Sequence, residues 1–493
     1  MAFLRRRPVS AEVLIVGAGA AGLMLAIELA RRGVAFRLID KLDAPFAGSR
    51  GKGIQPRSQE IFEDIGILDR VTASGGLYPV QREYRADGSM VDEVVMANDP
   101  PTPAEPYHAP LMVPQFLTER AMRERLAELG HAPQFGCALK KFKQDKDGVT
   151  AKLSTRETIR VRYLVGADGG RSFVRHALKI GFPGETLGVR AVVADVMLTG
   201  LPRDAWHRFN EGSMAKQMSL CPLMGTAMFQ LQAPIPLEGE IDMSAEGLTR
   251  VVAERTGRDD IRIQSVSWAS AFNMNARLAD RYSVGRVFLA GDAAHIHPPT
   301  GGQGLNTSIQ DAYNLGWKLA AVLRGAPGAL LDSYEEERRP VAAQMLGLAT
   351  KLLDAAKRGD MRRGREVHQL DIGYPESTLA LEKPQRQGGL LAGDRAPDAP
   401  ICGAAGQPTR LFALFQGPHW TLLCNGGDGV PPRAGLHIHS LGRDIRDDGG
   451  HVRDAYGLAD GDCVLIRPDG YVGAVVASTE NAALDAYLRN VGV

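Results

Sequence analysis

The stretch VFLAGDAAHIHPPTGGQGLNTSIQDAYNLGWKLAAVL, residues 287–323, organises the fold of this chain. Its first five residues, VFLAG, are a short apolar run ending in glycine, which is typical of a buried strand. Asp292 follows at the carboxyl end of that strand, where open α/β sheets bind their ligands. After a loop rich in glycine and proline, apolar residues recur at helical spacing from Asn306 to Leu323. The stretch therefore predicts a strand, a glycine loop and a helix whose N-terminus can face an anion.

A second glycine loop lies near the start of the chain. VLIV (13–16) predicts a strand, and Gly17, Gly19 and Gly22 form the pattern G-x-G-x-x-G ahead of an apolar helix. The next predicted strand ends in Asp40, and an acidic residue roughly 20 positions after the glycines can bind a ribose. The glycines permit a tight turn, the approach of a pyrophosphate and close packing of helix on strand. This combination predicts a dinucleotide-binding βαβ unit.

A third motif, YLVGADGGRSFVR at residues 163–175, places Asp168 directly after another short apolar strand. With the glycine fingerprint before it and GDAAH…P…GGQGLN (291–306) after it, this order of motifs resembles the class A flavoprotein monooxygenases. The similar branch includes phenol hydroxylases and aromatic polyketide hydroxylases, and the similarity covers residues 12–345 and extends more loosely to the C-terminus. The resemblance implies an α/β fold with a Rossmann-like FAD-binding domain, an inserted β-sheet substrate domain and a thioredoxin-like C-terminal domain.

The chain of 493 residues is long enough for two or three domains. We expect the FAD-binding domain at residues 1–182 and 276–357, a substrate-binding β-sheet domain at 183–275, a linker at 358–389 and the thioredoxin-like domain at 390–493. The last domain lacks a C-x-x-C pair, so we assign it no redox chemistry.

The resemblance also implies a reaction. FAD takes a hydride from NADPH or NADH, binds O₂, and forms a flavin C4a-hydroperoxide that hydroxylates an aromatic substrate, phenolic or polyketide-like. The sequence contains no second nucleotide fingerprint, which agrees with a nicotinamide that docks transiently, and NADH and NADPH both remain open. Two alternatives also remain: a flavin-dependent oxidase or reductase without oxygen insertion, and a flavoprotein that sequesters an aromatic ligand.

The predicted cofactor residues come from the three motifs and from positions that match the family. Gln115 matches a glutamine at the flavin ribityl chain, with a helix N-cap as the alternative, and Leu139 matches a position near the adenine. For Asp168, a place near both cofactors competes with a structural strand-end cap. The predicted set is Gly17, Gly19, Ala21, Gly22, Asp40, Lys41, Arg50, Gln115, Leu139, Asp168, Asp292, Pro299, Gly302, Gly304, Leu305 and Asn306.

The substrate-side candidates rest on fewer matches, and no catalytic base is assigned. They are Arg50, Lys52, Gln217, Gln230 and Pro299. Some phenol hydroxylases carry a catalytic aspartate in the loop that here contains Lys52, and this chain departs from them there. Within residues 228–232, Phe229 and Leu231 are predicted on one face of a strand and Gln230 on the other, because side chains alternate along a strand.

The cysteines and histidines argue against a disulfide framework and a metal site. The five cysteines, at positions 137, 221, 402, 424 and 463, are odd in number and form no C-x-x-C pair. His295 and His297 form an H-x-H pair, but their loop offers no third ligand, so we expect no metal.

The net charge of +1 favours neither a nucleic-acid partner nor a membrane surface. Arginines 5–7, followed by the apolar run 13–30, resemble the start of a signal peptide or membrane span. The glycine fingerprint and Glu28 within that run favour a cofactor-binding unit, and no other run approaches the roughly 20 apolar residues of a span. We therefore expect a cytoplasmic enzyme whose partners are an aromatic small molecule and O₂, with a homodimer left open.

Overall fold

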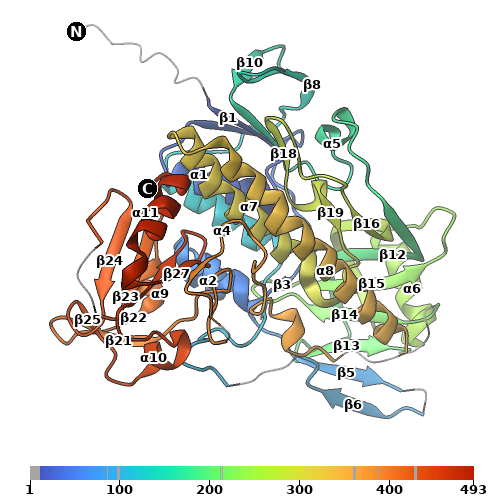
Figure 1. Ribbon diagram of the computed structural model, residues 1–493. Coiled ribbons are helices and arrows are strands. Elements are labelled where there is room, and N and C mark those ends of the chain that lie inside the picture. The colour runs from blue at the N-terminus through green and yellow to red at the C-terminus, as the bar shows by residue number, and fades with distance from the viewer. Residues whose placement is uncertain are drawn as a thin grey trace, which may run out of the picture.

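The computed structural model describes residues 11–85, 87–96, 100–210, 213, 215–358, 362–386, 388–426 and 430–493. Arginines 5–7 lie outside these ranges. A five-stranded sheet in the order β17-β18-β11-β1-β2 forms the centre of the half of the molecule that contains the three glycine-rich motifs (Figure 1). We call this part the cofactor half, after the prediction from its sequence. Strands β18, β11, β1 and β2 run parallel, and β17 adds an antiparallel edge. The bounds are β1 Val13–Val16, β2 Phe36–Ile39, β11 Tyr163–Gly166, β17 Ser283–Val284 and β18 Val287–Leu289.

Long helices cover this sheet, and the pair α7 and α8 crosses the middle of the molecule in Figure 1. Helix α7 buries almost all of its residues because it packs between α1 and α8. The predicted strand, glycine loop and helix of residues 287–323 are confirmed, although α7 begins at Gln303 rather than Asn306. The bounds are α1 Ala20–Ala30, α4 Gln115–Glu128, α7 Gln303–Leu323, α8 Asp332–Lys357, η1 Gly291–Ala293, η2 Thr300–Gly302 and η3 Gly328–Leu331.

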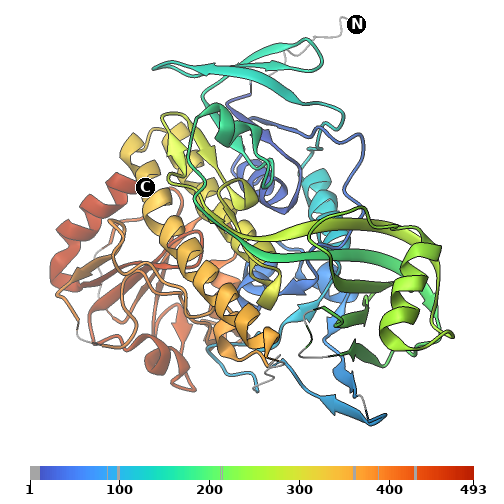
Figure 2. The same ribbon diagram turned by 90° about the vertical axis from the view of Figure 1, so that its right-hand side faces the viewer.

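A second sheet of eight strands, in the order β19-β16-β12-β15-β14-β13-β5-β6, forms the other half (Figure 2). It reaches beyond the predicted range 183–275 because the hairpin β5–β6 and the short strand β19 join its edges. Register shifts interrupt the long pairing of β12 with β16 and bend the sheet locally. The bounds are β5 Val80–Tyr84, β6 Met90–Glu93, β12 Gly184–Thr199, β13 Ala205–Phe209, β14 Met218–Pro222, β15 Phe229–Ile235, β16 Arg262–Leu278 and β19 His295–Ile296.

The two faces of this sheet differ in chemistry. Phe229 and Leu231 belong to one buried apolar core with Leu248 and Val252 of helix α6, Ala245–Thr256. Gln230 points to the opposite face, where its side-chain amide donates to the carbonyl oxygen of Ser49. The predicted alternation along this strand is therefore confirmed, and the polar face is directed at the cofactor half.

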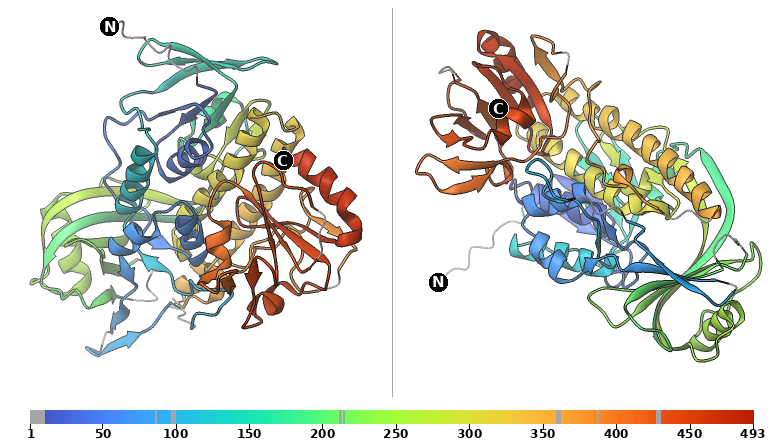
Figure 3. Two further views of the ribbon diagram at one scale, coloured as in Figure 1. Left: turned by 90° about the vertical axis from the view of Figure 1, so that its left-hand side faces the viewer. Right: turned by 90° about the horizontal axis from the view of Figure 1, so that it is seen from below.

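The C-terminal domain lies on the side of the cofactor half opposite to the eight-stranded sheet (Figure 3). Its sheet has the order β20-β27-β26-β23-β24, with β23 and β24 parallel and β26 antiparallel to both neighbours. This arrangement agrees with the predicted thioredoxin-like architecture. The bounds are β20 Leu381–Lys383, β21 Pro400–Gly403, β22 Pro408–Arg410, β23 Trp420–Cys424, β24 Leu436–Ser440, β25 Ile445–Arg446, β26 Asp462–Ile466, β27 Val472–Ala477, α9 Leu411–Phe415, α10 His451–Tyr456 and α11 Asn481–Val491.

Cys424 and Cys463 form a disulfide in this domain. The expectation against disulfides is therefore wrong at this pair. The two cysteines are 39 positions apart in sequence but lie directly opposite each other on β23 and β26. Their proximity follows from the strand register, which the spacing of the cysteines does not reveal.

A buried charge network fastens the C-terminal domain to helices α7 and α8. Both terminal nitrogens of Arg467 donate to the Glu337 carboxylate at 2.7 and 2.9 Å. Lys318 of α7 donates to the same carboxylate at 2.7 Å, and Arg467 also pairs with Asp469. All four side chains are essentially fully buried. Because each charge has an opposite partner, the interface tolerates their burial.

Short elements complete the chain. None of the helices in the described part combines the length and the apolar character that a bilayer span needs. The remaining bounds are α2 Pro56–Asp64, α3 Leu68–Ala73, α5 Phe173–Ala177, β3 Gly53–Ile54, β4 Gly76–Leu77, β7 Leu111–Met112, β8 Leu139–Gln144, β9 Val149–Leu153, β10 Thr158–Val161, η4 Arg365–Val367 and η5 Ser478–Glu480.

Candidate active site

The three glycines of the fingerprint have different surroundings. Gly17 has φ +107°, and a Cβ there would lie 2.2 Å from the carbonyl oxygen of Ala167, while a Cβ on Gly22 would lie 1.9 Å from that of Gly17. At Gly19 the nearest protein atom would be Oε1 of Glu119, at 3.8 Å. Gly17 and Gly22 thus permit the close packing of the βαβ unit, whereas Gly19 leaves room at the N-terminus of α1. This room suits a pyrophosphate.

Asp40 stands beside this turn at the end of β2. Its carboxylate accepts the backbone N–H of Ala18 at 2.7 Å and that of Leu42 at 2.8 Å. The carbonyl of Asp40 accepts from the N–H of Cys137 at 2.8 Å, which brings the segment before Leu139 alongside. Leu139 is buried at the start of β8, and the neighbouring Lys41 is exposed. The structure therefore brings Asp40, Lys41 and Leu139 to one end of the predicted cofactor site.

The DG motif connects two strand ends. Oδ2 of Asp168 accepts the N–H of Val174 at 3.1 Å, so the structural cap expected for this residue is present. Its other oxygen is buried without a hydrogen-bond partner among the described residues. Arg175 donates to the carbonyls of Gly170 and Ala293, each at 2.8 Å. Arg175 thereby holds the DG loop against the turn that contains Asp292.

Asp292 lies in η1, directly after β18, and is exposed between the buried residues Gly291 and Ala293. Although the carboxylate reaches the surface, the protein groups around it displace part of its hydration and raise its pKa, and His295 and Arg50 oppose that change. The influence of Arg50 indicates that this arginine faces the same edge of the sheet. Its guanidinium lies 5.0 Å from the ring centroid of Phe46.

Asp311 of α7 holds the Asp292 turn in place. Its carboxylate accepts from the N–H of Gly291 at 3.1 Å, from His295 Nε2 at 2.7 Å and from Arg338 Nε at 2.9 Å. The opposing influence of His295 and Arg338 keeps the pKa of Asp311 below its usual range despite its burial. Nε2 of His295 is thus engaged in a hydrogen bond with the Asp311 carboxylate. Burial lowers the pKa of its neighbour His297 to about 3, so that imidazole stays neutral.

The glycine loop after the turn leads into α7. Gly301 and Gly302 adopt left-handed backbone with φ +79° and +65°, and Pro299 is exposed. A Cβ on Gly304 would meet His297 Nδ1 at 3.9 Å. These conformations turn the chain so that the helix begins abruptly at Gln303. The first N–H groups of a helix lack carbonyl partners within it and can bind an anion.

Asn306 and Leu305 connect α7 to the segment that contains Arg50 and Lys52. The side chain of Asn306 is fully buried, accepts the N–H of Gln55 at 2.9 Å and donates to the carbonyls of Gly53 and Gly302. Leu305 lies 3.5 Å from the position of a Cβ on Gly51. The side chain of Asn306 therefore clamps protein segments together, and a cofactor contact there would involve its backbone.

Gln115 lies at the start of α4 and joins this segment to Glu119. Its Oε1 accepts the N–H of Gly51 at 3.3 Å, and its Nε2 donates to Glu119 Oε1 at 2.8 Å. Glu119 is buried, and this burial raises the pKa of its carboxyl to about 7. The same carboxylate oxygen is the nearest atom to Gly19, so Gln115 and Glu119 both border the predicted pyrophosphate space.

A row of side chains crosses the polar face of the eight-stranded sheet. Trp268, Asp195, Gln230 and Cys221 lie directly opposite one another on β16, β12, β15 and β14, and such antiparallel partners share a face. Lys52 reaches towards this row, with its Nζ 4.4 Å from the ring centroid of Trp206 on β13. Because Trp206 packs with Cys221, Lys52 lies on the same face of this sheet as Gln230.

Gln217 lies further away. It precedes β14, four positions before Cys221, which corresponds to about 13 Å along a strand. Its backbone carbonyl accepts from Arg255 of α6, the helix on the opposite face. The position of Gln217 at this end of the sheet does not favour a role beside Lys52.

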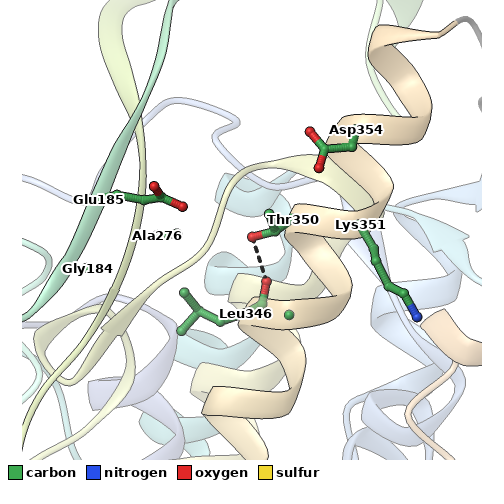
Figure 4. Close-up of a pocket in the computed structure, with 8 residues that line it drawn as sticks. Gly184, Glu185, Ala276, Leu346, Thr350, Lys351 and Asp354 are labelled. Carbon is green, nitrogen blue, oxygen red and sulfur yellow. Dashed lines mark hydrogen bonds between the residues drawn. The ribbon is translucent and has the colours of Figure 1, made fainter.

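One groove of the molecule lies outside the candidate site (Figure 4). It has a volume of about 540 Å³ and lies between α8 and the strands β12 and β16. Its lining includes Glu185, Ala276, Leu346 and Thr350 and none of the predicted cofactor or substrate residues. This groove is therefore separate from the candidate site.

Comparison with known proteins agrees with this geometry. A sequence model of an FAD binding domain matches residues 10–349, and one of the aromatic-ring hydroxylase C-terminal domain matches residues 390–491. A flavin-dependent monooxygenase from Mycobacteroides abscessus is 42% identical over 94% of this chain and 97% of its own length. The chain belongs to the FAD-dependent aromatic-ring hydroxylases.

Two further relatives of this aromatic-ring hydroxylase are informative. A rifampicin monooxygenase from Streptomyces venezuelae is 39% identical and covers 94% of both chains. The crystal structure of aklavinone-11 hydroxylase with FAD and aklavinone superposes with a TM-score of 0.81 at 27% identity and covers 99% of each chain. The similarity to these enzymes therefore extends over the C-terminal domain as well.

The cofactor edge of the hydroxylase fits FAD. Gly19 leaves room at the N-terminus of α1, one oxygen of Asp168 has no hydrogen-bond donor among the described residues, and the Asp292 carboxylate is exposed at the strand end. These three features lie on β1, β11 and β18, which are neighbours in the sheet. They therefore lie along one polar edge of this sheet, where a dinucleotide can bind.

Two residues of this site were missed by sequence reasoning. Glu119 follows Gln115 by four positions on one helix, so both side chains share a face, and that spacing could have identified it. Asp195 interrupts the apolar run AVVADVM in β12. A carboxylate inside a strand that is otherwise buried is unusual and could have marked Asp195 as a candidate.

Proposed function

We propose that this enzyme hydroxylates a phenolic or polyketide-like aromatic substrate with O₂ and NADPH or NADH. One observation carries the proposal: the edge that contains Asp292 and the polar row of the eight-stranded sheet both face the segment 46–55. Arg50 influences Asp292 from that segment, and Lys52 reaches from it to Trp206. A cofactor on one side of the segment and a substrate on the other would meet there.

Each residue of the cofactor edge has a proposed role. The N-terminus of α1 at Gly19 would bind the pyrophosphate, Asp40 a ribose, and Asp292 the ribityl–phosphate region. The N-terminus of α7 would stabilise negative charge on a reduced flavin by roughly 0.3–2 kcal/mol. Bound FAD would supply hydride acceptance and oxygen activation, which no side chain provides.

The substrate side is proposed to contain Lys52, Gln230, Arg50 and Pro299. The relatives named for rifampicin and aklavinone support a substrate with several rings and oxygen substituents. A supply of NADPH or NADH is available in the cytoplasm, and we place the reaction there.

The test is turnover of the purified protein with a panel of phenols, naphthoquinones and polycyclic polyketides. We expect at least one compound to accelerate NADPH or NADH oxidation and to gain one oxygen atom, labelled when ¹⁸O₂ is supplied. Stoichiometric hydrogen peroxide without a hydroxylated product would favour an oxidase. Tight retention of an aromatic compound without turnover would favour a sequestering flavoprotein.

A further inference from the structure

Lys52 carries a buried positive charge beside the polar row. Its side chain is 9% exposed, and its Nζ is buried without a hydrogen-bond partner among the described residues. The aromatic ring of Trp206 lies 4.4 Å away, and Trp206 forms a small core with Met112 and Cys221. Burial raises the pKa of the Cys221 thiol, and Lys52 opposes that change. The ammonium therefore lies near the β13–β14 end of the row.

Asp195 carries the complementary charge on the same row. Its side chain is fully buried, at 0% exposure, and neither of its oxygens makes a hydrogen bond of normal geometry with a donor in the described ranges. Burial raises the pKa of this carboxyl to about 6, and the nearby hydroxyl and backbone N–H of Ser49, together with the charge of Lys52, oppose the change. The charge of Lys52 therefore acts on Asp195, although the two side chains form no direct ion pair.

The strand register gives the approximate separation of the two groups across the sheet. Asp195 on β12 and Cys221 on β14 are separated by β15, hence by two strand spacings of about 10 Å in total. Gln230 lies between them, and its side-chain amide donates a hydrogen bond to the backbone carbonyl of Ser49. A single phenol ring is shorter than this span, whereas oxygen atoms on different rings of a fused aromatic system match it.

Burying both groups without a hydrogen bond of normal geometry is costly for the fold. A buried ammonium and a buried carboxylate each lose their hydration, and the contacts of Cys221 with Lys52 and of Ser49 with Asp195 replace it only in part. A Cβ on Gly51, the residue before Lys52, would lie 3.5 Å from the Cβ of Leu305 in the first turn of α7, so Lys52 lies next to the predicted cofactor site. Buried charged groups that destabilise the fold and lie beside a predicted cofactor site are candidates for ligand binding.

We propose that Lys52 and Asp195 recognise opposite ends of a polycyclic phenol: Lys52 binds an ionised phenol or enol oxygen, and Asp195 accepts a hydrogen bond from a hydroxyl on another ring. The proton of the first phenol passes to solvent when the anion binds. The oxygen anion raises the electron density of its ring, which favours attack on an electrophilic oxygen. This inference rests on the proposed function, because it specifies the substrate of that same site.

Three coloured anthraquinones test the two contacts separately. 2,6-Dihydroxy-9,10-anthraquinone offers both oxygens, 2-hydroxy-9,10-anthraquinone offers one, and 2,6-dimethoxy-9,10-anthraquinone offers no hydroxyl. Binding to the FAD-loaded enzyme is measured by flavin fluorescence. We expect the dihydroxy compound to bind at least 10-fold more tightly than the dimethoxy compound, and the monohydroxy compound to lie between them.

Variants assign each preference to its residue. Lys52→Met is expected to abolish the part of the hydroxyl preference that comes from the ionised oxygen, so that the pH at which the bound monohydroxy compound ionises returns to its value in water, without lowering Tm, because the change removes a buried charge. Asp195→Asn is expected to abolish only the preference for the dihydroxy over the monohydroxy compound. The control Lys143→Met changes an exposed lysine on β8 and is expected to retain both preferences. If Lys52→Met binds the dihydroxy compound as tightly as the unaltered enzyme does, the inference is wrong.

A measurement on the unaltered enzyme remains decisive if a variant does not fold. Ionisation shifts the visible band of 2-hydroxy-9,10-anthraquinone, and we expect the bound compound to ionise at a pH at least one unit below that in water. The charged and titratable groups facing it are Lys52, Asp195, Tyr78, Cys221, Arg203 and Arg208. An unchanged ionisation, or FAD-loaded enzyme that binds none of the probes, overturns the inference. Absence of FAD from the purified protein would instead overturn the proposed function.

Discussion

Gly17 approaches Ala167 so closely that a Cβ on Gly17 would lie 2.2 Å from the carbonyl oxygen of Ala167. This contact lies between the ends of β1 and β11 and involves no ligand. The first glycine of the fingerprint is therefore required by the fold, whereas Gly19 faces open space where the cofactor is expected. The two glycines should respond differently to the same substitution.

We predict that Gly17→Ala lowers the stability of the apoprotein, whereas Gly19→Ala mainly weakens FAD binding. The first change adds a backbone clash at φ +107°, a conformation that costs a non-glycine residue about 1–3 kcal/mol before the clash is counted. Thermal unfolding of the apoproteins and FAD titration separate the two effects. Equal loss of apoprotein stability in both variants would contradict this assignment.

Glu119 should make the stability of the apoprotein depend on pH. Its folded-state pKa of about 7 exceeds the ordinary 4.5, so the protonated form favours the fold and stability falls as the pH rises through that window. A difference of this size corresponds to about 3 kcal/mol. Glu119→Gln should remove that component in urea unfolding at pH 5 and pH 8. The exposed Glu124→Gln on the same helix should retain it.

The buried network at the C-terminal domain should be essential for stability. Arg467→Met leaves the Glu337 and Asp469 carboxylates short of partners, and breaking a buried pair in this way costs about 3–5 kcal/mol. Arg250→Met, which removes an exposed pair with Asp242, should cost less than about 1 kcal/mol. Urea unfolding measures both. Similar small losses would show that the network contributes little to holding the domain.

The cofactor half could be predicted because its determinants are local. Gly17, Gly19, Asp40 and Asp292 each stand at a strand end that short apolar runs identify, and parallel strands bring such ends to one edge of a sheet. Composition and spacing were sufficient there, and the family resemblance supplied the order of the three motifs.

The missed features depend on contacts between distant strands. Asp195, Gln230 and Cys221 form a row only through the register of β12, β15 and β14, and the Cys424–Cys463 pair also follows from register. Spacing in sequence carries no such information, because any register that keeps the faces correct satisfies the same alternation. Lys52 was singled out as a departure from a family pattern, and its acidic counterpart Asp195 was not.

Asp292 provides the last prediction, because three elements position it: β18 ends before it, Asp311 holds the backbone N–H of Gly291 beside it, and the glycine loop follows. A carboxylate there can accept hydrogen bonds from cofactor hydroxyls, and a charged hydrogen bond contributes about 1.5–3 kcal/mol. Asp292→Ala should therefore weaken FAD affinity by about 10- to 100-fold. Turnover should recover largely in excess FAD, since the contact holds the cofactor and moves no proton. The exposed Asp147→Ala serves as control and should bind FAD normally. Unchanged FAD affinity combined with loss of turnover would assign Asp292 to the chemistry instead.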